Sequence, residues 1–274
     1  MKVFRSKTLW FILYGIVITF LFLYLLFPGE LLKSRMEGAA SSAGFALRSS
    51  SLQASFPLGV KLKNVTLSSD AFGPYPLFQG EALDMQYSWQ SLLGKSAHLG
   101  LRGNAYNGSF RGSIAVASLA KIYPPAQAEV DFKNIDLQKV GLIKNKFGRE
   151  ISGKARGWLN YTADAGGNIE EGALNIFIAA GAYPLGEPFL GIEKIDFEAG
   201  QIKAAFKNGS VILEKIEISG SKINCLLAGD IFPAANFAES RLNLRGTIEV
   251  AGKDKIKMQV TISGTLANPV FKYI

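Results

Sequence analysis

Few residues in the chain have the chemistry of a catalytic or metal site. Its 274 residues include one histidine, His98, and one cysteine, Cys225. A zinc site of the usual composition needs several such ligands, and a Ser-His-Asp triad would depend wholly on His98. Cys225 lies in the alternating apolar stretch INCLLAG, which favours a small buried side chain over a reactive thiol. We therefore predict no catalytic, cofactor-binding or metal-binding residue and no cofactor.

Sequence motifs for nucleophilic or phosphate chemistry are also missing. The patterns G-x-S-x-G, H-E-x-x-H and G-x-x-x-x-G-K-[ST] do not occur. Gly94-Lys95-Ser96 matches the end of the last pattern, but Trp89 stands where its first glycine belongs. A hydrolase that uses His98, or the carboxylates Asp164 and Glu170, is the weakest hypothesis, because isolated carboxylates in turns are usually solvated. The prediction is a protein that is not an enzyme.

The charge distribution argues against nucleic acid as a partner. The net charge is +8, and Lys2, Arg5 and Lys7 leave about +5 for the remainder. No basic cluster is present that would neutralise several phosphates together. A weak attraction to anionic lipid headgroups fits this balance. The other basic residues are mostly scattered singly, as on the solvated face of strands, for example Lys61, Lys63, Lys203, Lys207, Lys255 and Lys257.

An apolar stretch near the N-terminus, Leu9–Phe27, contains no charged residue. As a helix it would cover roughly 28 Å, which is close to the hydrocarbon thickness of a bilayer. Because the basic residues precede it, the positive-inside bias places residues 1–8 in the cytoplasm. The prediction is a transmembrane signal anchor over 9–27, with the rest of the chain exported.

A cleavable signal peptide is the alternative interpretation of the same stretch. Its apolar region is typically about 7 to 15 residues long and is followed closely by a site of small residues. Here the apolar run is longer, and the first cluster of small residues, Gly38–Ala43, lies well beyond its end. We therefore favour an anchor that is retained.

Residues 28–44 carry an apolar stripe at helical spacing. Leu31, Leu32, Met36 and either Ala39 or Ala40 fall on one face, with charged residues between them. This predicts a juxtamembrane amphipathic helix that ends near Gly44. We expect it to pack on the first strands rather than on the membrane surface, because it lacks the Trp or Phe anchors of interfacial helices.

From residue 45 the apolar period changes from 3.6 to 2, which predicts an antiparallel β domain over 45–274. Strand and turn lengths suggest roughly twelve to sixteen strands. Asn107-Gly108 and Asn208-Gly209 predict tight hairpin turns. A second short helix is expected over 136–147. The stretch 182–191 contains Pro184 and Pro188 and is predicted to be a loop, because proline does not fit a central strand.

Each predicted strand has one apolar face that must be shielded from water. Closing a barrel, pairing two sheets or curling one long sheet into a trough would each achieve this. The 29 glycines favour strong curvature. The predicted fold class is mainly β: one N-terminal transmembrane helix, then a large antiparallel, strongly curved sheet, an open trough or barrel-like, with one or two short helices.

The order of several segments resembles that of a known family. They are FPLGVKLKNVTLS (56–68), YSWQSLLGK (87–95), NIDLQKVGLI (134–143) with EISGKARGWLNY (150–161), and ISGTLANPVFKYI (262–274). Together with the anchor, they resemble the protein N family of the type II (general) secretion pathway. The chain is also similar to the AsmA-like group of inner-membrane-anchored periplasmic β-proteins, in which the ending Gly-Thr-Leu-x-x-Pro is common. The resemblance covers nearly the whole chain, in strand and turn segments rather than a chemical signature.

The resemblance implies a single-pass protein of the inner membrane of a diderm bacterium, with a cytoplasmic N-terminus and a periplasmic β domain. It implies a non-enzymatic component of the type II secretion system that acts through protein contacts. The alternative is an AsmA-like protein of lipid binding, lipid transfer or outer-membrane biogenesis that uses the apolar groove of the curved sheet. The expected partners are the bilayer, other type II secretion subunits and phospholipid. Tyr75, Tyr183 and Phe189, in proline-rich segments, would either meet a partner or cap the sheet.

Overall fold

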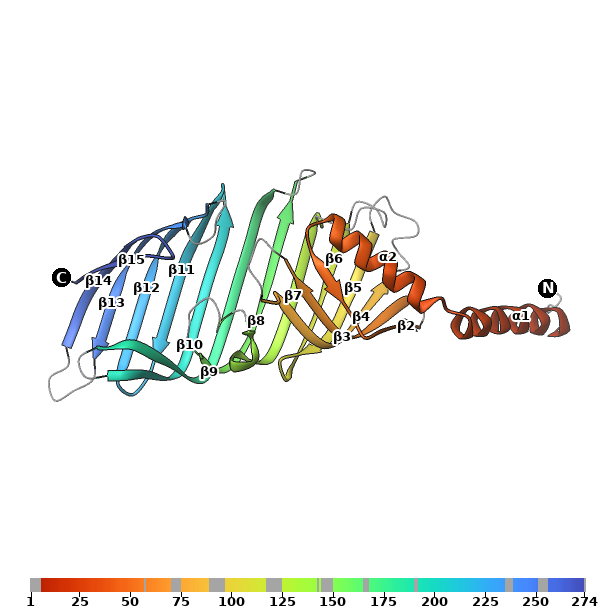
Figure 1. Ribbon diagram of the computed structural model, residues 1–274, viewed down its shortest axis with the longest axis horizontal. Coiled ribbons are helices and arrows are strands. Elements are labelled where there is room, and N and C mark those ends of the chain that lie inside the picture. Colours follow the sequence, from red (N-terminus) through yellow and green to blue (C-terminus); the bar gives the residue numbers. More distant parts are fainter. Residues whose placement is uncertain are drawn as a thin grey trace.

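Two helices precede one long sheet in the computed structural model (Figure 1). Helix α1 is Ser6–Leu25 and helix α2 is Gly29–Ser42. The side chains of 6–8, 20, 23, 25, 185–189 and 192 are not described. The structure describes residues 6–56, 58–69, 75–88, 97–116, 125–141, 143, 150–164, 168–189, 192–234, 239–250 and 256–273.

The sheet has 15 strands, and from β3 onward each strand pairs antiparallel with the next one in the chain. Strands β1 and β2 both pair with β3 and form one edge, while β15 forms the other, so the sheet is open. The mainly β prediction is confirmed, in its open form. The strands are β1 Ala46–Arg48, β2 Ser51–Ser55, β3 Gly59–Ser68, β4 Phe78–Tyr87, β5 Ala97–Ala105, β6 Gly108–Val116, β7 Gln127–Asp136, β8 Ser152–Ala163, β9 Ile169–Phe189, β10 Ile192–Lys207, β11 Ser210–Ser219, β12 Ile223–Phe232, β13 Arg241–Val250, β14 Ile256–Gly264 and β15 Pro269–Tyr273.

Hairpin turns depend on residues that accept a positive φ. Asn208 (φ 52°) and Gly209 (φ 73°) join β10 to β11, as the sequence predicts. Between β5 and β6 the left-handed residues are Tyr106 (φ 52°) and Asn107 (φ 60°), so this turn lies one residue earlier than predicted. Gly108 instead begins β6, where a Cβ atom would approach the carbonyl oxygen of Lys133 to 2.5 Å. Close backbone approach, not turn geometry, therefore requires that glycine.

Glycines on the apolar face allow the sheet to curve. A Cβ atom at Gly112 would overlap the carbonyl oxygen of Glu129 on β7, and one at Gly246 would overlap that of Leu226 on β12. Gly100 lies on the opposite face, and the nearest atom to a Cβ there is the Gln86 oxygen at 3.7 Å. Neighbouring strands thus lean over the apolar face where a glycine leaves room for them.

Helix α2 packs on the first strands, which confirms the predicted packing. Its Leu32 and Met36 contact a buried cluster formed by Leu52, Leu62 and Val65. Leu31, assigned to the same stripe, is instead 63% exposed. The packed face of α2 is therefore narrower than the sequence suggested. A second buried cluster lies farther along the sheet and consists of Ala204, Leu213 and Leu244.

The loop predicted over 182–191 is wrong, because β9 continues through Pro184 to Phe189. Pro184 pairs with Lys194 of β10. The pairing of β8 with β9 ends at Ala182, so beyond it β9 and β10 continue as a two-stranded ribbon. Proline fits such a strand because its missing N–H breaks no ladder bond on the open side.

The second predicted helix, over 136–147, falls only partly on described residues. A 3₁₀ turn, Leu137–Lys139, follows Asp136, whose carboxylate accepts a hydrogen bond from the Gln138 backbone N–H at 3.2 Å, and Gly141 and Ile143 beyond it are also helical. Residues 142 and 144–149 lie outside the described part of the chain. The sequence also favours one helical turn over Ser91–Gly94, and residues 89–96 likewise lie outside the described residues.

Helix α1 projects beyond the β2 edge of the sheet (Figure 1). Most of its described side chains are exposed apolar groups, such as Trp10, Phe11 and Val17. Within the described residues, no helix meets both the length and the hydropathy that a bilayer span requires.

We predict that Gly246→Ala destabilises the chain and Gly100→Ala does not. Gly246→Ala forces the strands apart and should lower the free energy of unfolding by about 1–3 kcal/mol. Gly100→Ala meets no close atom and should leave it unchanged or raise it by about 0.5–1 kcal/mol. Urea unfolding of the full chain in detergent measures both. Equal effects of the two substitutions would contradict this explanation of the curvature.

Candidate functional site: an apolar trough

One face of the sheet carries apolar residues in unbroken rows across the strands. The central row follows the strand pairing from β3 to β15, and a second row runs beside it. No charged or amide side chain occurs in either row. The central row is Leu62, Leu83, Gly103, Phe110, Phe132, Gly157, Ile176, Ile202, Ile216, Leu227, Gly246, Val260 and Tyr273. The second row is Val60, Met85, Leu101, Gly112, Val130, Leu159, Leu174, Ala204, Leu213, Gly229, Leu244, Ile262 and Phe271.

β-Bulges keep these rows on one face. In β11 the apolar residues change phase between Leu213 and Ile216, and the pairing with β12 shifts at the same place. In β7 the pairing with β8 shifts between Phe132 and Ile135. An unpaired extra residue returns the following side chains to the face that they would otherwise leave. The apolar residues therefore stay on one face of the sheet, although their alternation in the sequence changes phase.

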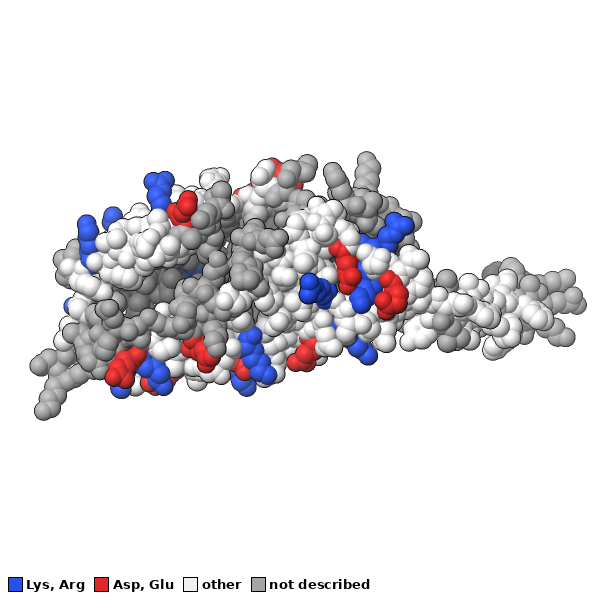
Figure 2. Space-filling view, in the orientation of Figure 1, with Lys and Arg blue, Asp and Glu red and all other residues white. Residues whose placement is uncertain are grey.

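The apolar face is a trough rather than a closed core. Where α2 covers it, Leu62 is 1% exposed, whereas Phe271 and Tyr273 on β15 are each 50% exposed. Most members between these ends are half-buried. Figure 2 shows the molecule hollowed over the C-terminal strands, with Lys, Arg, Asp and Glu near the border of the hollow. The curvature of the sheet shields the rows without burying most of them.

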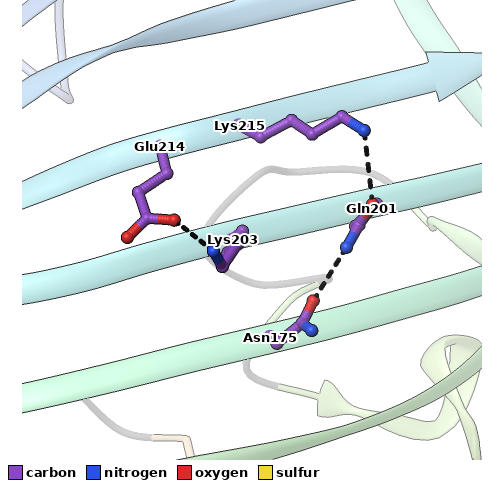
Figure 3. A network of polar contacts seen from close by, with 5 residues as sticks. All are labelled: Asn175, Gln201, Lys203, Glu214 and Lys215. Carbon is purple, nitrogen blue, oxygen red and sulfur yellow. Dashed lines mark hydrogen bonds and ion pairs between the residues drawn. The ribbon is translucent and has the colours of Figure 1, made fainter.

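The opposite face of the sheet is polar. Gln201 on β10 donates its amide N–H to Asn175 Oδ1 on β9 at 3.1 Å, and Lys215 Nζ on β11 donates to Gln201 Oε1 at 3.5 Å (Figure 3). Lys203 and Glu214 form an ion pair at 2.6 Å beside them. Exposed ion pairs of this kind each contribute about 0–1 kcal/mol. Their main effect is to keep this face solvated, so that the two faces differ in chemistry.

A large cavity lies where the trough meets the helices, and we call it the helix-end cavity. Its volume is about 1200 Å³, more than the roughly 300–1,000 Å³ typical of small-molecule sites. Its lining residues include Phe22 near the end of α1, Leu26 just after that helix, Met36 of α2, and Met85 and Leu99 of the sheet. The lining is almost wholly apolar, so the cavity suits a hydrocarbon ligand.

A smaller depression of about 410 Å³ lies on the polar face. Its lining includes Arg102 and Arg111 together with Asp84, Glu129 and Asp131. Arg111 and Asp131 form an exposed ion pair at 3.9 Å. Charges of both signs lie side by side here, so the depression does not present a field of one sign to a ligand.

The structure does not place His98 near the other candidate catalytic residues, Asp164 and Glu170. His98 is exposed on β5, whereas Asp164 and Glu170 flank the turn into β9, and three strands separate β5 from β9. Asp164 accepts hydrogen bonds from the Asn168 backbone N–H at 2.9 Å and from its side-chain amide at 3.0 Å. That carboxylate therefore shapes the turn. Within the described ranges, no group of three or more His, Cys, Asp or Glu side chains is arranged to hold a metal ion.

The three aromatic residues considered as partner contacts lie in different settings. Tyr75 is exposed before β4, and Tyr183 is half-buried on β9. The side chain of Phe189 lies outside the described set.

The helix-end cavity was not predicted from the sequence, because its walls come from α1, α2 and five strands. Only the apolar stripe that includes Leu32 and Met36 signalled one wall of it.

Cys225 lies on the apolar face, in a third row between Ile218 of β11 and Ile248 of β13. Burial raises the pKa of its thiol above the ordinary value. The next residue, Leu226, points to the polar face and is 48% exposed. These neighbours offer a matched pair of probes for the two faces.

Comparisons with models of known families, with curated proteins and with solved structures give no match. The trough, its open edges and the helix-end cavity are therefore the features from which function is inferred.

We predict that the rate at which Cys225 reacts with a maleimide rises with pH around a midpoint higher than that of an exposed thiol. The thiolate is the reacting form, and a raised pKa lowers its fraction at pH 8. A matched control is Leu226→Cys in a Cys225→Ser background, whose exposed thiol should titrate near its ordinary value. The rate–pH profile of Cys225 should lie at higher pH than that of the control. If Cys225 instead reached a lower plateau rate than the control with the same pH midpoint, access of the reagent, and not desolvation of the thiol, would limit the reaction.

Proposed function

We propose that the protein is a non-enzymatic, inner-membrane-anchored periplasmic protein that binds the acyl chains of phospholipid in its trough. The observation that carries this proposal is the pair of unbroken apolar rows from β3 to β15 on an open sheet. At about 4.8 Å per strand, the rows extend roughly 60 Å. Soluble monomers rarely expose contiguous apolar patches of that extent unless the patch binds something.

Acyl chains fit the rows better than a peptide does. A peptide brings backbone N–H and C=O groups that must be hydrogen-bonded when buried. The only polar side-chain atom in the two rows is the hydroxyl of Tyr273 at the open edge. Hydrocarbon needs no such partner and gains about 25 cal/mol per Å² of apolar surface removed from water. The half-buried state of most row residues leaves that gain to be realised on binding.

The anchor belongs to the same proposal. The uncharged stretch Leu9–Phe27 follows Lys2, Arg5 and Lys7, which supports a span with the N-terminus in the cytoplasm. The exposed apolar side chains of α1 would be costly in water, and a bilayer would cover them. The β domain then lies in the periplasm, next to the membrane that supplies its ligand.

We predict that phospholipid protects Cys225 from maleimide. The full chain, delipidated and held in amphipol, is labelled with and without added dioleoyl phosphatidylglycerol. Labelling of Cys225 should slow at least five-fold with lipid, because acyl chains cover the third row. Leu226→Cys in the Cys225→Ser background should change less than two-fold, since it lies on the polar face. Equal labelling with and without lipid, with no phospholipid detected by mass spectrometry in the purified chain, would exclude the trough as a lipid site.

We also predict that the chain resists extraction from membranes by alkaline carbonate. Replacing Leu13 and Val17 together with lysine should release it, because each lysine near the middle of a span costs about 2.5–3.5 kcal/mol. Leu31→Lys on the exposed side of α2 is the control and should remain in the membrane pellet. Release of the unmodified chain by carbonate would contradict the anchor.

A second candidate function is a type II secretion component that acts through protein contacts. The edge position of β15 favours it, because no strand of the described residues pairs beyond β15 and its Val270 and Phe271 are about half exposed. Such an edge accepts an added strand from a partner. Co-isolation with secretin or inner-membrane platform subunits supports this candidate, and normal secretion in a deletion strain contradicts it.

A further inference from the structure

The helix-end cavity connects the apolar surface of α1 to the trough. Ile18, Phe22 and Leu26 line it from α1 and the residues after it. Val60 and Met85, which begin the second row, line it from the sheet. A ligand in this cavity would therefore touch the proposed membrane span and the trough at the same time.

The floor of the cavity continues into a further row of the apolar face. Tyr87, Leu99 and Ile114 line the cavity and pair in succession across β4, β5 and β6. The same register leads on through Ala128 of β7 to Tyr161 of β8. Hydrocarbon that enters the cavity thus meets a continuous apolar path along the sheet.

The two side-chain hydroxyls of serine and threonine in the lining are already used within the protein. The Thr19 hydroxyl donates to the Gly15 carbonyl oxygen at 2.8 Å. The Ser55 hydroxyl donates to Asp84 Oδ2 at 3.0 Å. Neither hydrogen is left to bind water in the cavity, so these residues add little to the cost of filling it with hydrocarbon.

Helix α2 makes the two ends of the trough different. It covers the central row at Leu62, where Leu32 and Met36 pack over the first strands. The second row at Val60 and Met85 remains open to the helix-end cavity. At the other end, Phe271 and Tyr273 are each 50% exposed. The cavity is therefore the opening of the trough on the side of α1.

We propose that the helix-end cavity is the loading mouth of the trough, through which an acyl chain of a bilayer phospholipid passes from beside α1 onto the sheet. This inference rests on the proposed anchor and acyl-chain-binding trough. The occupant is a diacyl phospholipid, because the cavity adjoins the surface that the bilayer would cover and its volume exceeds that of ordinary small-molecule sites.

The test uses the full chain in proteoliposomes of phosphatidylethanolamine and phosphatidylglycerol. A photo-crosslinking residue is placed at Met85 in the mouth or at Ile262 on β14, far along the second row. Both positions should crosslink phospholipid. Leu99→Asp, which puts a charge in the mouth, should lower crosslinking at Ile262 at least five-fold. The control Leu226→Asp on the polar face should leave it unchanged.

Ile114→Trp provides a second variant in case Leu99→Asp does not fold. It narrows the mouth without adding charge and should lower crosslinking at Ile262 by a similar factor. Unchanged crosslinking at Ile262 in a folded mouth variant would overturn the loading mouth and leave the acyl-chain trough standing, with lipid entering along its open side. No crosslinking at either position in the unmodified chain would overturn the proposed function itself.

Discussion

A sheet that is one layer thick has no second layer against which to bury its apolar face, so it must bend over that face. Bending brings the backbone of one strand close to the residue below it, and a side chain at that residue prevents the approach. Gly112 and Gly246 lie at such places, where a Cβ atom would overlap a neighbouring carbonyl oxygen. The curvature of the sheet and the partial shelter of the rows both depend on these close approaches.

Local alternation predicted the β character of most of the chain, because from β3 onward each strand is paired with the next one in the sequence. The antiparallel β domain, the Asn208-Gly209 turn and the packing of α2 follow from residue periods and turn residues, whereas the choice of an open sheet over a barrel or paired sheets does not. The β9–β10 ribbon was missed because the exclusion of proline assumes a strand with neighbours on both sides. Whether Pro184 has such neighbours depends on where β8 and β11 end, and no local pattern states that.

From the sequence, the candidate site could be predicted only as an apolar face of the sheet, without the alignment of its rows or its cavity. Alternation in single strands, such as Ile256 to Ile262, indicates an apolar face but not the register that aligns it with other strands. The bulges in β7 and β11 help to maintain that register, and each is visible in the sequence only as a change of phase. The helix-end cavity depends in addition on how α1 and α2 pack against the sheet. No pattern in the sequence of these segments indicates that tertiary arrangement.

Because of the strand order, the position of a strand in the chain gives its distance along the trough. From β3 to β15 each strand adjoins the next, so each step adds about 4.8 Å along one axis. Adding or removing one hairpin would change the length of the trough by roughly 10 Å while preserving strand direction and the inward face of every remaining residue. A protein built in this way can be lengthened or shortened by duplicating or deleting hairpins, and its two ends need not change.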